Sequence, residues 1–233
     1  MRIQNKTLMK ILAMMSAFSG VLVLTYVFYP IIFYEWDNSN RFGTYLSPVP
    51  NHSQVNSPTD YTKASNWFEE DSQKEEDKFK SAKISYYTIS IPRLRITDAT
   101  VAIGGENLSD SLIQYPGTAL PGKRGNAVIF GHSVLPQFYD PKNYLTIFST
   151  LPALKAGDEV LARYDGVAYK YVVEDMFEVS PTDIQVLEQN QSDSFLTLVT
   201  CTPPGHPLRP KRLIVRARVV PFRANAGETA NRN

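Results

Sequence analysis

Phe195-Leu-Thr-Leu-Val-Thr-Cys201, which runs directly into Thr202-Pro-Pro-Gly205, is the part of the chain that most constrains its architecture. The run is uncharged and rich in apolar and β-branched side chains, which is typical of a buried strand. The prolines that follow cannot continue the backbone hydrogen bonding of a strand, so this strand must end near its cysteine. A second run, Arg212-Leu-Ile-Val-Arg-Ala-Arg218, follows a ten-residue loop and predicts an antiparallel return strand.

Upstream of this pair, other short runs alternate with Gly, Pro and Asp, and Asp165-Gly166 is typical of a hairpin turn. We expect strands at Ile84–Ile91, Ala99–Ile103, Asn126–Gly131, Asp158–Tyr164, Val167–Val173, Phe195–Cys201 and Arg212–Val220. Helical segments are expected at Ser109–Tyr115 and Asn143–Leu151. This pattern predicts one mainly β domain, a barrel or a sandwich, over residues 84–222.

The N-terminal region carries 24 uncharged residues, Ile11–Tyr34, whereas a helix needs about 20 apolar residues to cross a bilayer. Three basic residues precede this stretch, and Glu35 and Asp37 follow it. Since Lys and Arg stay on the cytoplasmic side, we expect a single-pass membrane protein whose main domain is extracytoplasmic. The alternative is a cleavable signal peptide. Signal peptides have a shorter apolar region that ends in small residues, and this stretch has neither feature, so a retained anchor is favoured.

The chain is thus divided into five parts: a cytoplasmic N-terminus (1–10), a transmembrane anchor (11–34), an extracytoplasmic polar linker (35–83), the β domain (84–222) and a disordered tail (223–233). Charges of both signs crowd the end of the linker, which favours a solvated spacer or short helix. A minority alternative is a lid over an active site, anchored by Trp67, Phe68 and Phe79.

Composition excludes several classes of protein. The 24 Lys and Arg against 23 Asp and Glu give a net charge of +1, which does not favour a nucleic-acid partner. The single cysteine excludes an intrachain disulfide and clustered-cysteine metal sites. With no metal-binding motif, no cofactor and no catalytic metal are expected, although a structural calcium ion under a loop stays open.

The lone thiol is the first candidate for chemistry, because Cys201 lies at a strand end beside a loop, within reach of a substrate. An unpaired thiol in an exported domain is at risk of oxidation, which favours a functional role for it. The competing interpretation is a buried structural cysteine. A thiol is weakly ionised at neutral pH and needs a basic partner. His132 begins a loop at another strand end, whereas His206 lies in a proline-flanked loop and His52 in the linker.

A cationic residue is also needed to stabilise a tetrahedral oxyanion. In an antiparallel hairpin, Arg212 returns close to the end of the cysteine-bearing strand. Arg216 and Arg218 share its face of the strand, and Arg209 in the loop is the substitute candidate.

In combination these residues resemble the sortase family. The sequence Thr197-Leu-Val-Thr-Cys201 is followed by Arg212-Leu-Ile-Val and preceded by Gly131-His132, and this ordered set is specific where each part alone would be weak. Further similarity lies in Ile89-Ser-Ile-Pro92, Pro116-Gly117, Leu154–Val160 and the Pro181-Thr-Asp183 region, so the resemblance spans residues 84–222.

The resemblance implies a β-barrel of seven or eight strands and a cysteine transpeptidase that cleaves a Leu-Pro-x-Thr-Gly-like sorting signal. It implies Cys201 as nucleophile, His132 as general acid and base, Arg212 as the oxyanion-stabilising residue and Thr200 as a substrate-binding residue. Its partners would be exported proteins with a C-terminal sorting signal, an amine of the cell wall or of another surface protein, and the membrane.

Two departures favour a class D-like or housekeeping sortase as the subclass. The loop before Arg212 is long and proline-rich, and Ser133 stands where pilus-assembling members often carry Arg. Three other interpretations remain open. These are an exported cysteine hydrolase with the same triad, a peptidoglycan L,D-transpeptidase, whose cysteine motif does not match, and a non-catalytic β-barrel binding module.

Overall fold

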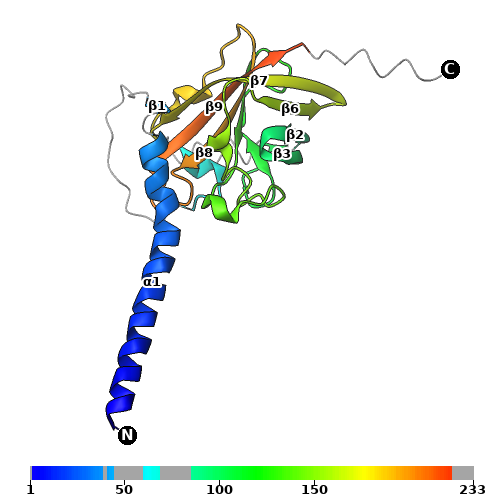
Figure 1. Cartoon of the computed structure of the whole chain (residues 1–233). Helices are drawn as coiled ribbons and strands as arrows, with labels where there is room; N and C mark the ends of the chain where they lie inside the picture. Colours follow the sequence, from blue (N-terminus) through cyan, green and yellow to red (C-terminus); the bar gives the residue numbers. More distant parts are fainter. Residues whose placement is uncertain (1, 39–40, 45–59, 69–84, 222–233) are drawn as a thin grey trace, which may run out of the picture. The chain divides into compact units, whose positions relative to one another are not determined.

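The computed structural model describes residues 2–38, 41–44, 60–68 and 85–221 (Figure 1). The chain divides into two compact units, residues 1–41 and 42–233. The first unit contains the long helix α1 (Arg2–Asn38), and the second contains the sheet.

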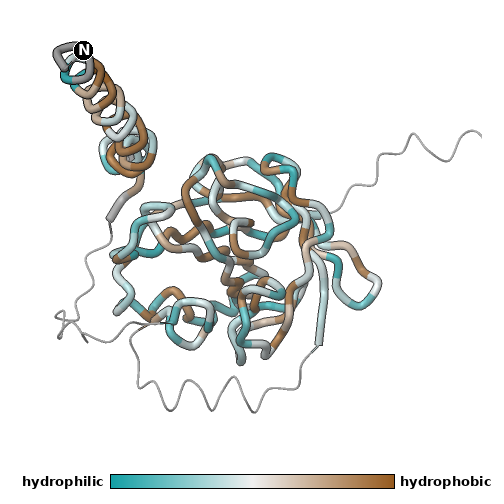
Figure 2. The backbone as a smooth tube through the Cα atoms, turned by 90° about the horizontal axis from the view of Figure 1, so that it is seen from below, coloured by the Kyte–Doolittle hydropathy of each residue, from teal (hydrophilic) through white to brown (hydrophobic). Residues whose placement is uncertain are grey.

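Helix α1 is apolar along most of its length, as the brown tube in Figure 2 shows. Its segment Lys6–Asp37 is long and apolar enough to cross a membrane by length and composition. The predicted anchor at 11–34 lies within this helix, which begins nine residues earlier, at Arg2. The membrane span itself and its orientation stay predictions.

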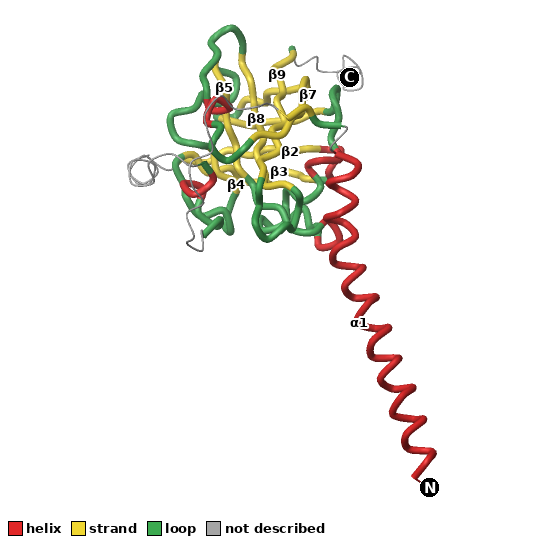
Figure 3. Tube along the Cα trace, turned by 90° about the vertical axis from the view of Figure 1, so that its left-hand side faces the viewer, coloured by secondary structure: helices red, strands yellow, loops and turns green. Residues whose placement is uncertain are grey.

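The second unit is a mainly β barrel (Figure 3). Its strands are β1 (Gly43–Thr44), β2 (Ser85–Ile91), β3 (Ile96–Ile103), β4 (Leu112–Gln114), β5 (Gly125–Phe130), β6 (Glu159–Tyr164), β7 (Val167–Val179), β8 (Ser194–Thr202) and β9 (Lys211–Val220). They form one sheet in the order β1-β7-β6-β2-β3-β4-β5-β8-β9. Because β7 also pairs with β9, the eight strands β2 to β9 close into a barrel.

Short 3₁₀ helices connect these strands or precede them. They are η1 (Ala64–Trp67), η2 (Pro92–Leu94), η3 (Pro136–Phe138), η4 (Leu151–Ala153) and η5 (Ile184–Leu187). The seven predicted strands all overlap observed ones, and the expected barrel is confirmed.

The helix predicted at Ser109–Tyr115 is wrong. Leu112–Gln114 form strand β4, which pairs in parallel with β3 and antiparallel with β5. All three residues of β4 are buried, so both faces of this strand are covered and it lacks the alternation that would distinguish it from a helix.

The helix predicted at Asn143–Leu151 is also wrong. The segment is a series of turns that ends in η4. The side chain of Asn143 accepts a hydrogen bond from the backbone N–H of Leu145, and that of Thr146 accepts one from the N–H of Asp140. Such side-chain bonds to the backbone compete with helix formation.

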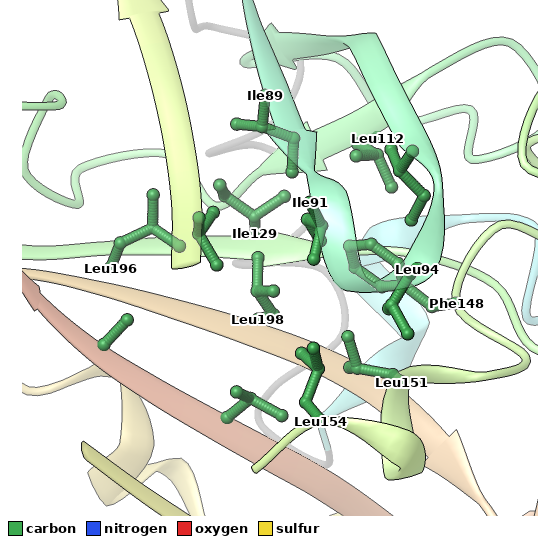
Figure 4. Packing of buried hydrophobic residues seen from close by; sticks show 14 of the residues in the cluster. Ile89, Ile91, Leu94, Leu112, Ile129, Phe148, Leu151, Leu154, Leu196 and Leu198 are labelled. Atoms are coloured by element: carbon green, nitrogen blue, oxygen red, sulfur yellow. The ribbon is translucent and has the colours of Figure 1, made fainter. Parts of the chain in front are cut away.

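The barrel interior holds the larger apolar cluster, to which each of the eight barrel strands contributes. Figure 4 shows part of it, with Ile89, Ile91, Leu94, Leu112, Ile129, Phe148, Leu151, Leu154, Leu196 and Leu198 labelled. Alternate residues of β8 point inward, and Leu196 and Leu198 belong to this interior cluster.

A second apolar cluster lies on the outer face of β5, β8 and β9, where Phe130, Val199, Cys201 and Ile214 belong to it. Residues 60–68, called the covering segment below, also belong to this cluster through Ala64, Trp67 and Phe68. The sequence placed this segment in the linker, whereas the structure packs it on the barrel. At the start of the predicted linker, residues 35–38 continue helix α1, and Gly43 and Thr44 form β1, which pairs with β7. Linker residues 39–40, 45–59 and 69–83 and the predicted tail 223–233 lie outside the described residues.

We predict that Leu198→Ala lowers the free energy of unfolding by about 2–5 kcal/mol, because it leaves a cavity in the closed interior cluster. The control is Leu208→Ala. Since the side chain of Leu208 is 76% exposed, its truncation should change the free energy of unfolding by less than about 0.5 kcal/mol. Denaturation of the full-length chain in detergent, followed by near-ultraviolet circular dichroism, measures both. Equal effects of the two variants would contradict the assigned interior.

Candidate active site

Strands β8 and β9 bring the predicted nucleophile and the predicted cation together. They pair antiparallel, and Cys201 and Arg212 are direct Cα partners in their register. Residues at such positions lie about 4.5–5.5 Å apart. Cys201 belongs to the outer apolar cluster and is only 2% exposed, so its thiol lies on the outer face of the barrel and is covered there.

His132 reaches the same end of the barrel from β5, which pairs in parallel with β8. The backbone N–H of Gly131 donates to the carbonyl of Val199 at 3.1 Å and extends this ladder by one residue. The hydroxyl of Ser133 donates to the carbonyl of Cys201 at 2.7 Å. His132 therefore lies between two residues that are each bonded to the end of β8.

Arg212 is buried, and its guanidinium is held by backbone carbonyls. Its Nε donates to the carbonyl of Trp67 at 3.0 Å, and its Nη1 donates to the carbonyls of Arg209 and Lys211 at 2.9 and 3.2 Å. Among the described residues, no ion pair with a carboxylate is formed by Arg212, so its charge stays available to an anionic or polarised group.

Trp67 of the covering segment joins these groups. Its ring stacks on Phe130 at a centroid distance of 5.4 Å and lies 5.8 Å from the imidazole of His132. The guanidinium of Arg212 lies 5.7 Å from the same indole ring. One side chain thus contacts both the predicted base and the predicted cation.

This cover changes the electrostatics of His132. Burial, and secondarily the positive charge of Arg209, lower the pKa of His132 to about 4, with an opposing contribution from Asp60. The Nε2 atom of His132 is buried, and it has no hydrogen-bond partner among the residues that the structure describes. At pH 7 the covered imidazole is neutral.

The other candidates are placed differently. Thr200 is fully buried and its hydroxyl donates to the carbonyl of Gly131 at 2.8 Å, so it ties β8 to the residue before His132. Nδ1 of His206 accepts a hydrogen bond from the N–H of Leu208 within its own loop. Arg209 stacks on Tyr61 of the covering segment, at 4.7 Å from guanidinium carbon to ring centroid. His52 lies outside the described residues.

The sortase domain model matches residues 89–220, which is more than half of the chain. The chain belongs to the sortase family. The matched range contains Cys201, His132 and Arg212.

Individual sortases agree with this assignment. The chain is 34% identical over 103 residues to sortase A of Staphylococcus aureus (strain NCTC 8325 / PS 47), in a match that covers 37% of this chain and 47% of that protein. It therefore spans about half the length of this curated relative.

Solved sortases share the fold. A Clostridium perfringens sortase D5 transpeptidase has a TM-score of 0.51 and 25% identity, over 66% of this chain and 91% of that one. A lid mutant of sortase A from Corynebacterium diphtheriae has a TM-score of 0.53 and 30% identity, over 63% and 76%. Since sortases of classes A, C and D all match, the class D-like or housekeeping lean stays a prediction.

Two features of this sortase site were not assigned from the sequence. Ser133 was noted only as a departure from other sortases, yet its hydroxyl bonds the carbonyl of Cys201. Tyr61 gave no signal, because a single aromatic residue in a polar segment has no period. Trp67 and Phe68 were noted as the anchors of an alternative lid, and two adjacent aromatic residues in a polar linker were the signal.

We predict that acidification destabilises this sortase through His132. The pKa of His132 lies near 4 in the folded chain and near 6.5 when solvated, so the unfolded chain binds more protons between these values. Its contribution to stability is complete above pH 6.5 and is lost as the pH falls to 4, by up to roughly 3 kcal/mol.

Carboxylates titrate in the same range, so the measurement compares the wild type with His132→Gln. As the pH falls from 7 to 4, the wild type should lose more free energy of unfolding than the variant, because only the wild type carries the buried imidazole. A difference that is constant with pH would contradict the burial of a neutral imidazole.

Proposed function

We propose that this sortase is a membrane-anchored cysteine transpeptidase that joins exported proteins to an amine at the cell surface. Its substrate would carry a Leu-Pro-x-Thr-Gly-like sorting signal, as the sequence resemblance implies. The observation that supports this most is the pairing of Cys201 with Arg212 beside the loop of His132, within the matched sortase domain.

In the first half-reaction, the thiolate of Cys201 attacks the carbonyl carbon of the signal's threonine. His132, whose imidazole is neutral at pH 7, has first taken the proton of the Cys201 thiol. The threonine–glycine C–N bond breaks, and the resulting imidazolium gives that proton to the departing amine. The products are a thioester on Cys201, a neutral imidazole and a released C-terminal peptide.

In the second half-reaction, an amine attacks the thioester carbonyl and His132 takes its proton. The C–S bond breaks, an amide forms and the Cys201 thiolate returns with the imidazolium. Hydrolysis follows the same course with water in place of the amine, so only the product distinguishes a transpeptidase from a hydrolase.

Arg212 would donate to the carbonyl oxygen on which negative charge develops. Its guanidinium is suited to this because backbone carbonyls fix its orientation while its charge is not neutralised by a carboxylate in the described part of the chain. The Nε donor now bonded to Trp67 would become available to the substrate.

The helix α1 would anchor the enzyme, with the barrel on the extracytoplasmic side where sorting signals emerge. Its apolar length and the basic residues near its start support this arrangement. Thr200 would support the signal site through the backbone of Gly131.

We predict that Cys201→Ala abolishes cleavage of a fluorogenic Leu-Pro-x-Thr-Gly peptide, and that Cys201→Ser nearly does, because a hydroxyl is far less ionised than a thiol. His132→Ala should lose several orders of magnitude in kcat/KM.

Triglycine is added to the full-length enzyme in detergent, and a ligated product detected by mass spectrometry distinguishes transfer from hydrolysis. Wild-type rates in a Cys201 variant would overturn the mechanism.

We predict that Arg212→Lys lowers kcat/KM by about 100-fold or more, although it keeps the charge, because lysine lacks the planar set of donors. The comparison variant is Arg209→Lys, which alters the neighbouring cation in the loop. An active Arg212 variant beside an inactive Arg209 variant would reassign the role to Arg209.

A further inference from the structure

We propose that Arg209 is a positioning residue for Arg212: its left-handed backbone turns its carbonyl onto Nη1 of Arg212, so that Nη2 is presented to the carbonyl oxygen of the substrate. This inference rests on the proposed transpeptidase function and assigns a further residue to the same site. It is carried by the backbone of the loop between β8 and β9, residues 203–210, called the β8–β9 loop below.

The backbone of Arg209 has a conformation that its sequence disfavours. Its φ angle is 45°, in the left-handed region that residues other than glycine rarely adopt. Pro210 follows, and a residue before proline normally takes extended backbone. Two local preferences are therefore overridden at one residue, and such strain persists only where surrounding contacts hold it in place.

The contact that this conformation makes is with Arg212. The carbonyl of Arg209 accepts a hydrogen bond from Nη1 of Arg212 at 2.9 Å, and the carbonyl of Lys211 accepts a second from the same nitrogen at 3.2 Å. Nη2 of Arg212 has no hydrogen-bond partner in the part of the chain that the structure describes. Because the guanidinium is planar, anchoring Nη1 fixes its plane and leaves Nη2 to donate to a substrate oxygen.

The side chain of Arg209 does not explain this geometry. Its guanidinium lies 4.7 Å from the ring centroid of Tyr61, and that of Arg212 lies 5.6 Å from the same centroid. Two like charges beside one ring repel each other. Nη1 of Arg209 is buried, and it finds no hydrogen-bond partner among the described residues. What Arg209 supplies to Arg212 is therefore its backbone carbonyl.

Contacts of the β8–β9 loop hold the strained residue. The N–H of Arg209 donates to the carbonyl of His206 at 3.2 Å. Gly205 has a φ of 77°, and a Cβ at this position would lie 2.8 Å from the backbone nitrogen of Leu135. The β8–β9 loop thus packs closely on the segment that follows the predicted base, and this packing fixes the direction of the Arg209 carbonyl.

The test compares two substitutions that both remove the guanidinium of Arg209. Asparagine adopts the left-handed region readily, whereas threonine is β-branched and resists it, and the two side chains are both polar and similar in size. Arg209→Thr should therefore lose the bond between its carbonyl and Arg212, and Arg209→Asn should keep it. The full-length enzyme in detergent is assayed with the fluorogenic signal peptide.

We expect kcat of Arg209→Thr to lie about tenfold below that of Arg209→Asn, with KM within twofold, because the oxyanion that Arg212 stabilises develops only in the transition state. Melting curves verify that both variants are folded. If Arg209→Thr does not fold, Arg209→Ala and Arg209→Gly make the same comparison, since glycine adopts positive φ without a steric penalty.

The matched control is the same pair of substitutions at Asp165, an exposed residue whose φ is 50°. It lies in the turn between β6 and β7, at the end of β7 opposite to Val179, which is the Cα partner of Arg212. Asp165→Thr should lower the melting temperature relative to Asp165→Asn, but kcat should stay within twofold. This control separates backbone strain in general from the positioning of Arg212.

A double-mutant cycle shows whether the effect passes through Arg212. In the background of Arg212→Lys, which lacks the planar set of donors, Arg209→Thr and Arg209→Asn should have equal kcat. A merely structural disturbance of the β8–β9 loop would lower kcat by the same factor in both backgrounds.

The outcomes separate this inference from the proposed function. Equal kcat of Arg209→Thr and Arg209→Asn beside an intact Arg212, or an unchanged ratio of the two in the Arg212→Lys background, overturns the positioning role and leaves the transpeptidase intact. A wild type that cleaves no signal peptide overturns the proposed function, and with it the role of Arg209 in that reaction.

Discussion

Strand β8 is hydrogen-bonded along both edges and buried on both faces, and the rest of the domain is arranged around it. Its parallel pairing with β5 places Gly131 and His132 at its end, and its antiparallel pairing with β9 places Arg212 opposite Cys201. The apolar residues on its inner side fill the barrel. One strand therefore fixes the fold and the spacing of the site together.

The outer face of β8 needs a cover, because Val199 and Cys201 lie beside Phe130 and Ile214 on a surface that is apolar. In this structure Trp67 and Phe68 provide it. The same cover withdraws His132 from water and occupies a donor of Arg212. The packing that stabilises this face of the domain therefore also limits access to the thiol of Cys201.

The strands could be predicted from sequence where their periodicity or their turns were clear, as at Asp165-Gly166 between β6 and β7. Prediction failed at β4, where three buried residues carry no period, and at residues 143–151, where the side chains of Asn143 and Thr146 bond the backbone. The sortase domain that contains Cys201, His132 and Arg212 could be recognised from sequence, because the order of these residues along the chain forms a motif.

Strand periodicity, apolar length and turn residues are local properties of a chain. They were therefore enough to predict a single mainly β domain, one long apolar N-terminal helix, and three chemically suitable residues at strand ends. Three features can be seen only in the folded chain: the register that makes Cys201 and Arg212 partners, the bond from Ser133 to β8, and the position of Trp67 beside His132 and Arg212. These features depend on contacts between residues that are 65 or more positions apart along the chain or that lie on separate strands. Long-range packing, and not the local sequence, determines such contacts.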